Sequence, residues 1–203
     1  MGKNQTLKNR ALASLEGKWT NAIVATIIYL LITGCVGQGV TTIFDGVTGY
    51  GISGFWTLLC LPMGWGITAY FLNLIRNEDI AYERLFDGYK DFVRIFLAEF
   101  LVVVCIAIGF MLLIIPGIIL ALMFCQTEYI LKDDKQISAA DAMKKSAEMM
   151  NGHKMEFFWL LLSFIGWLIL SFLTLGFGFI FLQPYMETTF AHYYEDLKAQ
   201  QAA

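Results

Sequence analysis

Four long stretches without a charged residue constrain this 203-residue chain more than any other feature. A helix that crosses a lipid bilayer needs roughly 20 mainly apolar residues, and soluble folds rarely supply several such runs. With 58% hydrophobic and only 15% charged residues, the chain is predicted to be an integral membrane protein. The residues that border the four stretches are Lys18 and Asp45, Asp45 and Arg76, Glu99 and Glu128, and Glu156 and Glu187.

Helix-breaking residues divide these stretches into six predicted transmembrane helices. Pro116 separates the third span from the fourth, because proline suits the first turn of a helix and disfavours helix at the residue before it. The glycines of Leu175–Gly178 separate the fifth from the sixth, since glycine allows a tight turn. The fold class is therefore all-α, a single membrane domain over 1–203. The expected spans are about 19–36, 55–75, 92–115, 116–131, 156–174 and 179–194.

The positions of the basic residues predict the orientation of the six spans. All 14 Lys and Arg lie in the N-terminal segment, in the charged stretches 76–94 and 132–154, or in the tail at Lys198. With six spans, all of these segments lie on one side, and the opposite loops, including 37–54, carry none. Because cytoplasmic loops are enriched in Lys and Arg, both termini are predicted to be cytoplasmic, in a bacterial inner membrane. Residues 37–54 suggest no role of their own.

A short amphipathic helix is expected before each pair of spans. Ser138–Met150 has an apolar face, and Ser138 with Asp141 fits a capping box at its start. Glu78–Tyr89 and Thr6–Glu16 show similar patterns, and each of the three segments is followed closely by or contains a glycine next to the span. We therefore predict a threefold internal repeat over residues 5–75, 76–131 and 132–197.

Several short motifs resemble those of a known family. The segments Ser146–Lys154, Phe164–Trp167 and Pro184–Tyr185, together with Tyr194, resemble the bacterial integral membrane family called domain of unknown function 975. Ile115–Gly117 and Ala13–Trp19 fit as well, so the resemblance extends over most of the chain. It implies a multi-span protein and supplies no reaction.

Acidic side chains inside predicted spans are the leading candidates for a functional site. A charged residue at the bilayer centre costs about 3 kcal/mol on insertion scales, so acids retained there indicate function. Aligning the predicted repeats places three polar residues at similar depth, with further amides nearby. The predicted polar intramembrane site, open to the cytoplasm, consists of Asn73, Glu99, Gln126, Glu128, Gln183 and Glu187. Alternatively, these acids form interhelical hydrogen bonds or pair with Arg94 or Lys132.

Two further groups lie at the predicted membrane surface. Lys144, Lys145, His153 and Lys154 form a basic cluster that can contact anionic lipid headgroups or serve only as a topology anchor. His192 with Tyr193 and Tyr194 is typical of an interfacial aromatic belt.

The chain lacks the signatures of most enzyme and metal sites. Its two histidines are far apart, and H-E-x-x-H, G-x-S-x-G and P-loop motifs are absent. No basic, aromatic-rich patch predicts nucleic-acid binding. We therefore expect no enzyme, no cofactor and no metal, with membrane lipids as the predicted partners and any protein partner or homo-oligomer unspecified. Acids converging with His153 around a water-filled cleft would instead favour an intramembrane enzyme.

Two functional hypotheses follow from the sequence. The first is a protein that binds or moves a lipid, an amphiphile or a small solute through its helical bundle. The second is an interaction or accessory protein, such as a stress or immunity factor or a subunit of a membrane complex. The polar side chains inside the spans favour the first.

Overall fold

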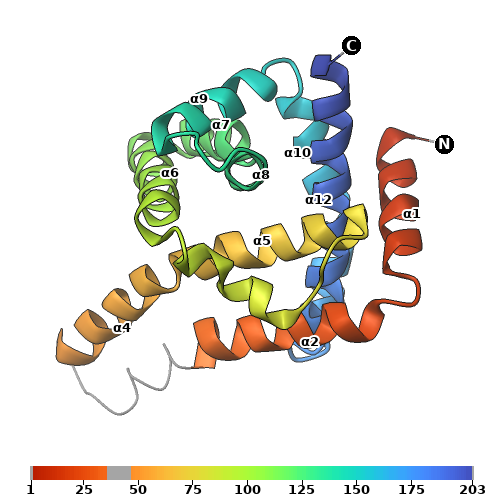
Figure 1. The fold of residues 1–203 in the computed structure, drawn as a ribbon, viewed down its shortest axis with the longest axis horizontal. Helices are drawn as coiled ribbons and strands as arrows, with labels where there is room; N and C mark the ends of the chain where they lie inside the picture. Colours follow the sequence, from red (N-terminus) through yellow and green to blue (C-terminus); the bar gives the residue numbers. More distant parts are fainter. Residues whose placement is uncertain (1, 36–46, 203) are drawn as a thin grey trace.

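The computed structural model describes residues 2–35 and 47–202, and these residues form helices and no strand (Figure 1). The segment 36–46, the larger part of the predicted outer segment 37–54, lies outside the described residues. In chain order the helices are α1 (Lys3–Leu15), α2 (Trp19–Leu30) with a π-helical turn (Leu31–Cys35), α4 (Val47–Leu59), α5 (Leu61–Arg76), the 3-10 helix η2 (Tyr82–Tyr89), α6 (Phe92–Leu112), α7 (Ile114–Phe124), α8 (Thr127–Asp133), α9 (Ala139–Met149), α10 (Lys154–Leu162), α11 (Ile165–Leu173) and α12 (Phe179–Ala202).

Four helical segments are long and apolar enough to cross a membrane. They are Gly51–Arg76, Phe92–Leu112, Ile114–Asp133 and Lys154–Leu173, with 20 to 26 residues each. A fifth candidate requires α1 and the helical stretch Trp19–Gly34 to count as one span bent by 97°. The chain thus has the helices that a membrane protein needs, while the full set of six spans stays a prediction.

The predicted helix breaks lie within a few residues of the observed ones. Leu113 has extended backbone angles and separates α6 from α7, so Pro116 occupies the first turn of α7. Leu175 and Gly176 both have a positive φ, of 53° and 90°, and turn the chain between α11 and α12. The second span, expected from about Phe55 to Ile75, lies within the apolar helical stretch Gly51–Arg76.

Two of the three short amphipathic helices form as expected. In α1, Leu7, Ala11 and Leu15 are fully buried. In α9, the Ser138 hydroxyl accepts a hydrogen bond from the Asp141 backbone N–H, as a capping residue does. Gly17 and Gly152, which follow these helices, have φ values of 74° and 83° that favour glycine.

The middle amphipathic helix differs from the prediction. Instead of an α-helix over Glu78–Tyr89, the chain forms the 3-10 helix η2, which begins only at Tyr82. Its backbone lies directly on α5: a Cβ added to Gly66 would come 2.0 Å from the Leu85 carbonyl oxygen, and one added to Gly88 would come 2.2 Å from that of Pro62. Gly88 therefore permits close packing and does not act as the expected helix stop, and the threefold repeat stays a prediction.

The helices enclose two adjoining hydrophobic clusters. The larger one joins α1, α5, α6, α7, α8, α9, α10 and α12, and the smaller one joins α1, α2, α5 and η2. In Figure 1, α1 runs beside α12, and α5 extends from α4 toward α12. Because α5 contributes to both clusters and is almost entirely buried, it is the central helix of the fold.

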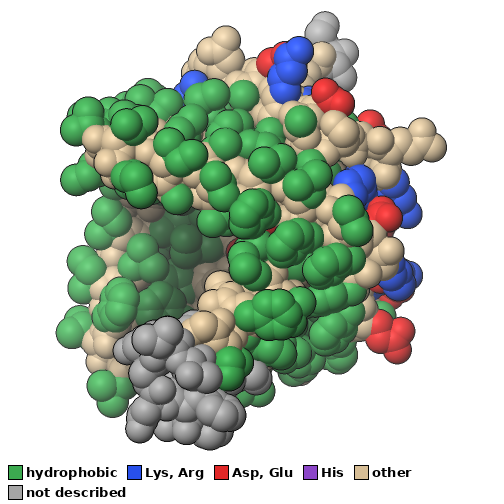
Figure 2. All heavy atoms as spheres, turned by 90° about the vertical axis from the view of Figure 1, so that its left-hand side faces the viewer, with side chains coloured by type: hydrophobic (Ala, Val, Ile, Leu, Met, Phe, Trp, Pro, Cys, Tyr) green, Lys and Arg blue, Asp and Glu red, His purple; other side chains and the backbone are tan. Residues whose placement is uncertain are grey.

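Hydrophobic side chains dominate one face of the molecule. Figure 2 shows this face, with Lys, Arg, Asp and Glu gathered along its right-hand and upper edges and a hollow between the hydrophobic side chains. The turns between α6 and α7 and between α11 and α12 are uncharged yet exposed, since Leu113 is 68% and Leu175 is 92% exposed. Water would oppose such exposure, whereas a bilayer would not.

Candidate functional site

Three acidic side chains from three helices lie in the interior of the bundle, and we call them the interior acids: Glu99 of α6, Glu128 of α8 and Glu187 of α12. Glu99 is only 8% exposed. Glu128 and Glu187 are half-buried, although flanking residues such as Thr127 and Thr188 are fully buried. Among the described residues none of the three forms an ion pair, so the alternative of pairing with Arg94 or Lys132 is wrong for them.

The interior acids lie close together. Glu99 and Glu187 are both near enough to Glu128 for their charges to interact with it. The hydroxyl group of Tyr29, on α2, lies within the same range of all three carboxyl groups. The hydroxyl group of Thr68, on α5, lies near the carboxyl group of Glu128. Five helices thus contribute to one polar region inside an otherwise apolar bundle.

A break between α7 and α8 positions Glu128. The hydroxyl group of Ser146, from α9, donates to the Met123 carbonyl at 2.8 Å and accepts from the Gln126 backbone N–H at 3.2 Å. It therefore satisfies backbone groups that the interrupted helix leaves without partners. The Trp65 indole N–H donates to the Glu128 carbonyl at 3.0 Å and holds the start of α8 against α5.

The three predicted amides, Asn73, Gln126 and Gln183, differ in burial and in their contacts. The Gln126 side chain is fully buried and donates to the sulfur atoms of Cys125 and Met150, while its Oε1 has no hydrogen-bond partner among the described residues. Gln183 is half-buried on α12. Asn73 donates to the Asp79 carbonyl at 3.1 Å and lines a different pocket, near the charged end of α5.

The predicted basic cluster divides into two parts. Lys144 and Lys145 line an open groove of about 380 Å³ on the exposed side of α9. His153 and Lys154 lie where α10 begins, and His153 Nδ1 is 3.3 Å from Glu156 Oε2, which also accepts from Lys3. His153 is therefore engaged with Glu156 and not with the interior acids.

A comparison with known families identifies the group to which the chain is related. A family described as "Protein of unknown function (DUF975)" matches residues 99–201, about half of the chain. The chain belongs to this family. The matched region begins at Glu99 and contains all three interior acids. Residues 1–98, which include the Ala13–Trp19 motif, lie outside the matched region. No curated protein and no solved structure matches the chain.

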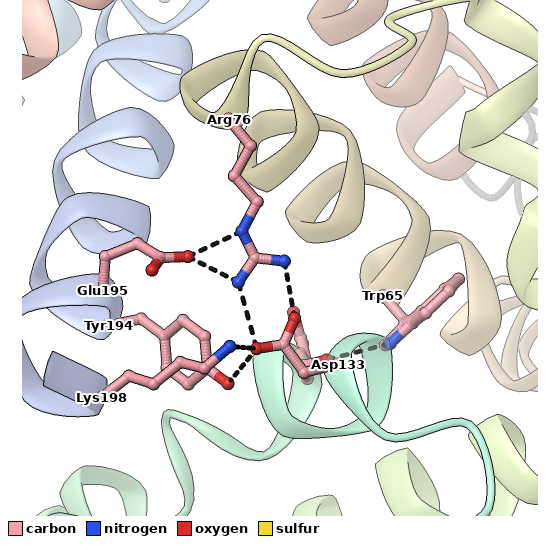
Figure 3. Close-up of polar contacts among 7 residues, drawn as sticks. Trp65, Arg76, Asp133, Tyr194, Glu195 and Lys198 are labelled. Atoms are coloured by element: carbon pink, nitrogen blue, oxygen red, sulfur yellow. Dashed lines mark hydrogen bonds and ion pairs between the residues drawn. The ribbon is translucent and has the colours of Figure 1, made fainter. Parts of the chain in front are cut away.

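An ion-paired group that links Arg76 to helical residues of the matched region, Lys198 among them, was not foreseen from the sequence. Arg76, at the end of α5, donates to Asp133 of α8 at 2.6 Å and to Glu195 of α12 at 2.7 Å (Figure 3). Tyr194 donates to Asp133 at 2.9 Å, and Lys198 pairs with the same carboxylate. We call these five residues the Arg76 cluster. Arg76 and Glu195 are 119 positions apart in sequence, and no local pattern connects Arg76 with its partners.

The interfacial role expected for the C-terminal aromatic residues was wrong. Tyr193 and Tyr194 are 1% and 2% exposed, and His192 is 9% exposed. Tyr194 stacks on Tyr129 at a centroid distance of 4.9 Å, and Tyr193 packs against Phe157. These side chains are buried because α1, α8 and α10 cover this part of α12, an arrangement that hydropathy does not reveal.

The geometry limits the chemistry available at the interior acids. Across the described residues, no three His, Cys, Asp or Glu side chains lie close enough to hold a metal ion. Carboxyl groups without cationic partners can bind a positively charged or hydrogen-bond-donating ligand, or can exchange protons.

Proposed function

We propose that this chain is a six-span protein of the bacterial cytoplasmic membrane with both termini in the cytoplasm. The four apolar helices, the exposed uncharged turns and the one-sided distribution of Lys and Arg support this topology. Here α2 with its π-turn and the first half of α12 are the remaining two spans.

The topology can be tested by labelling single cysteines in a background without the four native ones. Leu175→Cys, in the exposed turn after α11, should react with a membrane-impermeant maleimide in intact cells. Gln136→Cys, in the charged stretch before α9, should react only after the membrane is permeabilised. The reverse pattern would show the opposite orientation, and labelling of both in intact cells would contradict the span count.

We further propose that the protein, acting without catalysis, binds or moves a lipid, an amphiphile or a small solute at the interior acids. The observation that carries this proposal is the convergence of three carboxyl groups without ion-pair partners among the described residues. A purely structural role for buried acids calls for bound partners, because an unpaired buried charge is costly. A ligand with a positive charge or N–H donors beside an apolar part fits these surroundings.

Native mass spectrometry with lipidomics, on protein extracted in mild detergent, tests the binding site. Glu128→Gln and Glu187→Gln should each lose a stoichiometric bound species that the unmodified protein retains. Glu148→Gln is the matched control, because Glu148 is an exposed acid on α9. An identical set of bound lipids in all four samples would contradict the site and favour the partner-binding hypothesis, and co-purifying proteins would then be sought.

A further inference from the structure

A second polar pocket, separate from the interior acids, lies where the segment 77–91 meets the charged ends of α5, α6 and α8. Its volume is about 550 Å³. Trp65, Ile95 and Leu131, all nearly or fully buried, line its apolar part. Its remaining lining is strongly charged, with five basic and four acidic side chains. A pocket of this size accommodates a small polar group.

Most of the acids in this pocket already have basic partners. Arg84 pairs with Asp79 at 2.8 Å, and Lys90 pairs with Asp87 at 2.7 Å. The hydrogen bond from Arg84 lowers the pKa of Asp79. Burial alone would raise the pKa of Asp87, but hydrogen bonds from Lys90 and Arg84 outweigh it and lower that pKa. These two acids are therefore ionised at neutral pH and neutralise the Arg84 and Lys90 charges.

Other groups in the pocket have no partner among the described residues. Lys132 and Lys135 form no ion pair there, and Arg94 Nε is a buried donor without an acceptor. Asn73 is only 4% exposed, and its Oδ1 is an acceptor without a donor. Glu78 also forms no ion pair within the described residues. The pocket thus combines unused donors with unused acceptors.

The pocket adjoins a separate apolar groove on the outside of α6. A groove of about 520 Å³ shares Lys90, Asp91 and Arg94 with the pocket and is lined by Phe92, Val93 and Leu97. Val93 is 77% exposed and Leu97 is 47% exposed. Beside them, a row of stacked rings extends along α6 through Phe92, Phe96 and Phe100, with centroid distances of 5.3 and 5.9 Å. A charged pocket beside an exposed apolar helix face suits an amphiphile.

We propose that this pocket binds a phosphoethanolamine group, supplied as the headgroup of a phospholipid whose acyl chains lie along the α6 groove. Lys132, Lys135 and Arg94 Nε bind the phosphate, which accepts charge-assisted hydrogen bonds. Asn73 Oδ1 and Glu78 accept from the primary ammonium group. This inference rests on the membrane location proposed above but does not depend on ligand binding at the interior acids.

Lipid titration of the purified full-length protein in mild detergent, monitored by native mass spectrometry, tests this proposal. Dioleoyl phosphatidylethanolamine should bind several-fold more tightly than dioleoyl phosphatidylcholine, whose ammonium has no N–H donor. Lys132→Gln with Lys135→Gln should weaken its binding about tenfold, because two charge-assisted contacts are lost. The matched control is Lys144→Gln with Lys145→Gln, which removes the same charge from α9 and should leave the affinity unchanged.

The variant Glu78→Gln tests the proposed contact between the Glu78 carboxylate and the ammonium group of the lipid. It should reduce the preference for phosphatidylethanolamine over phosphatidylcholine, whereas Glu83→Gln, on the exposed side of η2, should preserve it. Equal effects of the two lysine pairs, or no preference between the two lipids, would overturn the proposal. Glu128→Gln should retain tight phosphatidylethanolamine binding, so a failure of the interior-acid site is distinguished from a failure here.

Free O-phosphoethanolamine identifies the source of the group. If it displaces the lipid only at far higher concentrations than the lipid itself requires, the acyl chains contribute and the ligand is a lipid. If it displaces the lipid at comparable concentrations, the same chemistry is recognised but a soluble compound is the ligand, and the assignment of the α6 groove to acyl chains is wrong.

Discussion

The Arg76 cluster and the interior acids both contain carboxyl groups in partly or fully buried positions. The carboxyl groups of the Arg76 cluster have ion-pair partners, whereas those of the interior acids have none among the described residues. In the Arg76 cluster, the Asp133 carboxylate, 16% exposed, receives Arg76, Tyr194 and Lys198, so α5, α8 and α12 are joined by charge-assisted hydrogen bonds. The interior acids also come from three helices, two of them α8 and α12, yet lack ion-pair partners among the described residues.

We infer from this difference that the Arg76 cluster is structural, whereas the interior acids fit the proposed binding site. A buried ion pair holds helices in register, and removing one partner leaves a charge without compensation. A buried acid without a partner adds nothing to stability and is costly in the bilayer, so it suits the binding of a ligand or a proton. The Arg76 cluster should therefore respond to mutation through stability, and the interior acids through binding.

The largest loss of stability is expected for Arg76→Met. It removes both ion pairs of Arg76 and leaves Asp133 and Glu195 with fewer partners, at a cost of about 3 kcal/mol for pairs that are partly buried. Thermal unfolding in detergent measures the change. Lys3→Met is the control, because the Lys3–Glu156 pair is more than 40% exposed and should contribute less than about 1 kcal/mol. Equal shifts for both variants would contradict a structural role of the cluster.

A smaller loss of stability is expected for Ser146→Ala. This variant should reduce both the stability of the protein and the binding of a ligand at the interior acids. The variant leaves the Gln126 N–H without its acceptor at the break between α7 and α8, at a cost of about 2 kcal/mol. Because this break positions Glu128, ligand retention in native mass spectrometry should fall as well. Ser163→Ala loses a local bond to the Leu160 carbonyl and should leave ligand retention unchanged. Full retention in Ser146→Ala would show that the break does not position Glu128.

Lys8 of α1 is intermediate between the ion-paired Arg76 cluster and the interior acids. It is a cation that is 7% exposed and has no acidic partner among the described residues. Its Nζ donates to the Ser163 carbonyl at 2.8 Å, at the break between α10 and α11, and lies 4.1 Å from the centre of the Phe164 ring. Lys8→Met keeps the apolar stem and should cost about 1 kcal/mol in thermal unfolding. A loss of stability as large as that of Arg76→Met would mean that a carbonyl group and an aromatic ring stabilise the buried Lys8 as much as carboxylates stabilise Arg76.

The smallest effect on stability is expected for Glu128→Gln and Glu187→Gln. Neither variant breaks an ion pair, and both replace a partly buried acid by an amide of the same size, so the change should stay within about 1 kcal/mol. Thermal unfolding, measured beside the binding assay, checks this. A loss comparable to that of Arg76→Met would assign the interior acids a structural role and remove the distinction between the two regions.

Much of the architecture followed from local properties of the sequence. The breaks near Pro116 and at Leu175–Gly178 and the cap of α9 at Ser138 depend on residues a few positions apart. The candidate acids were recognisable because each interrupts or borders a long uncharged run. Asn73 was misplaced, since depth along a helix does not specify which way the side chain points.

The local sequence therefore sufficed for the helical class and for the lengths of the apolar helices, because hydropathy and capping act over a few residues, and the orientation predicted from the basic residues stays a proposal. Three contacts became visible only in the folded structure. Ser146 hydrogen-bonds to backbone groups at the break between α7 and α8, η2 packs closely on α5 at Gly66 and Gly88, and Arg76 pairs with Asp133 and Glu195. These contacts join residues tens of positions apart, and they depend on how the helices pack against one another, which no local pattern encodes.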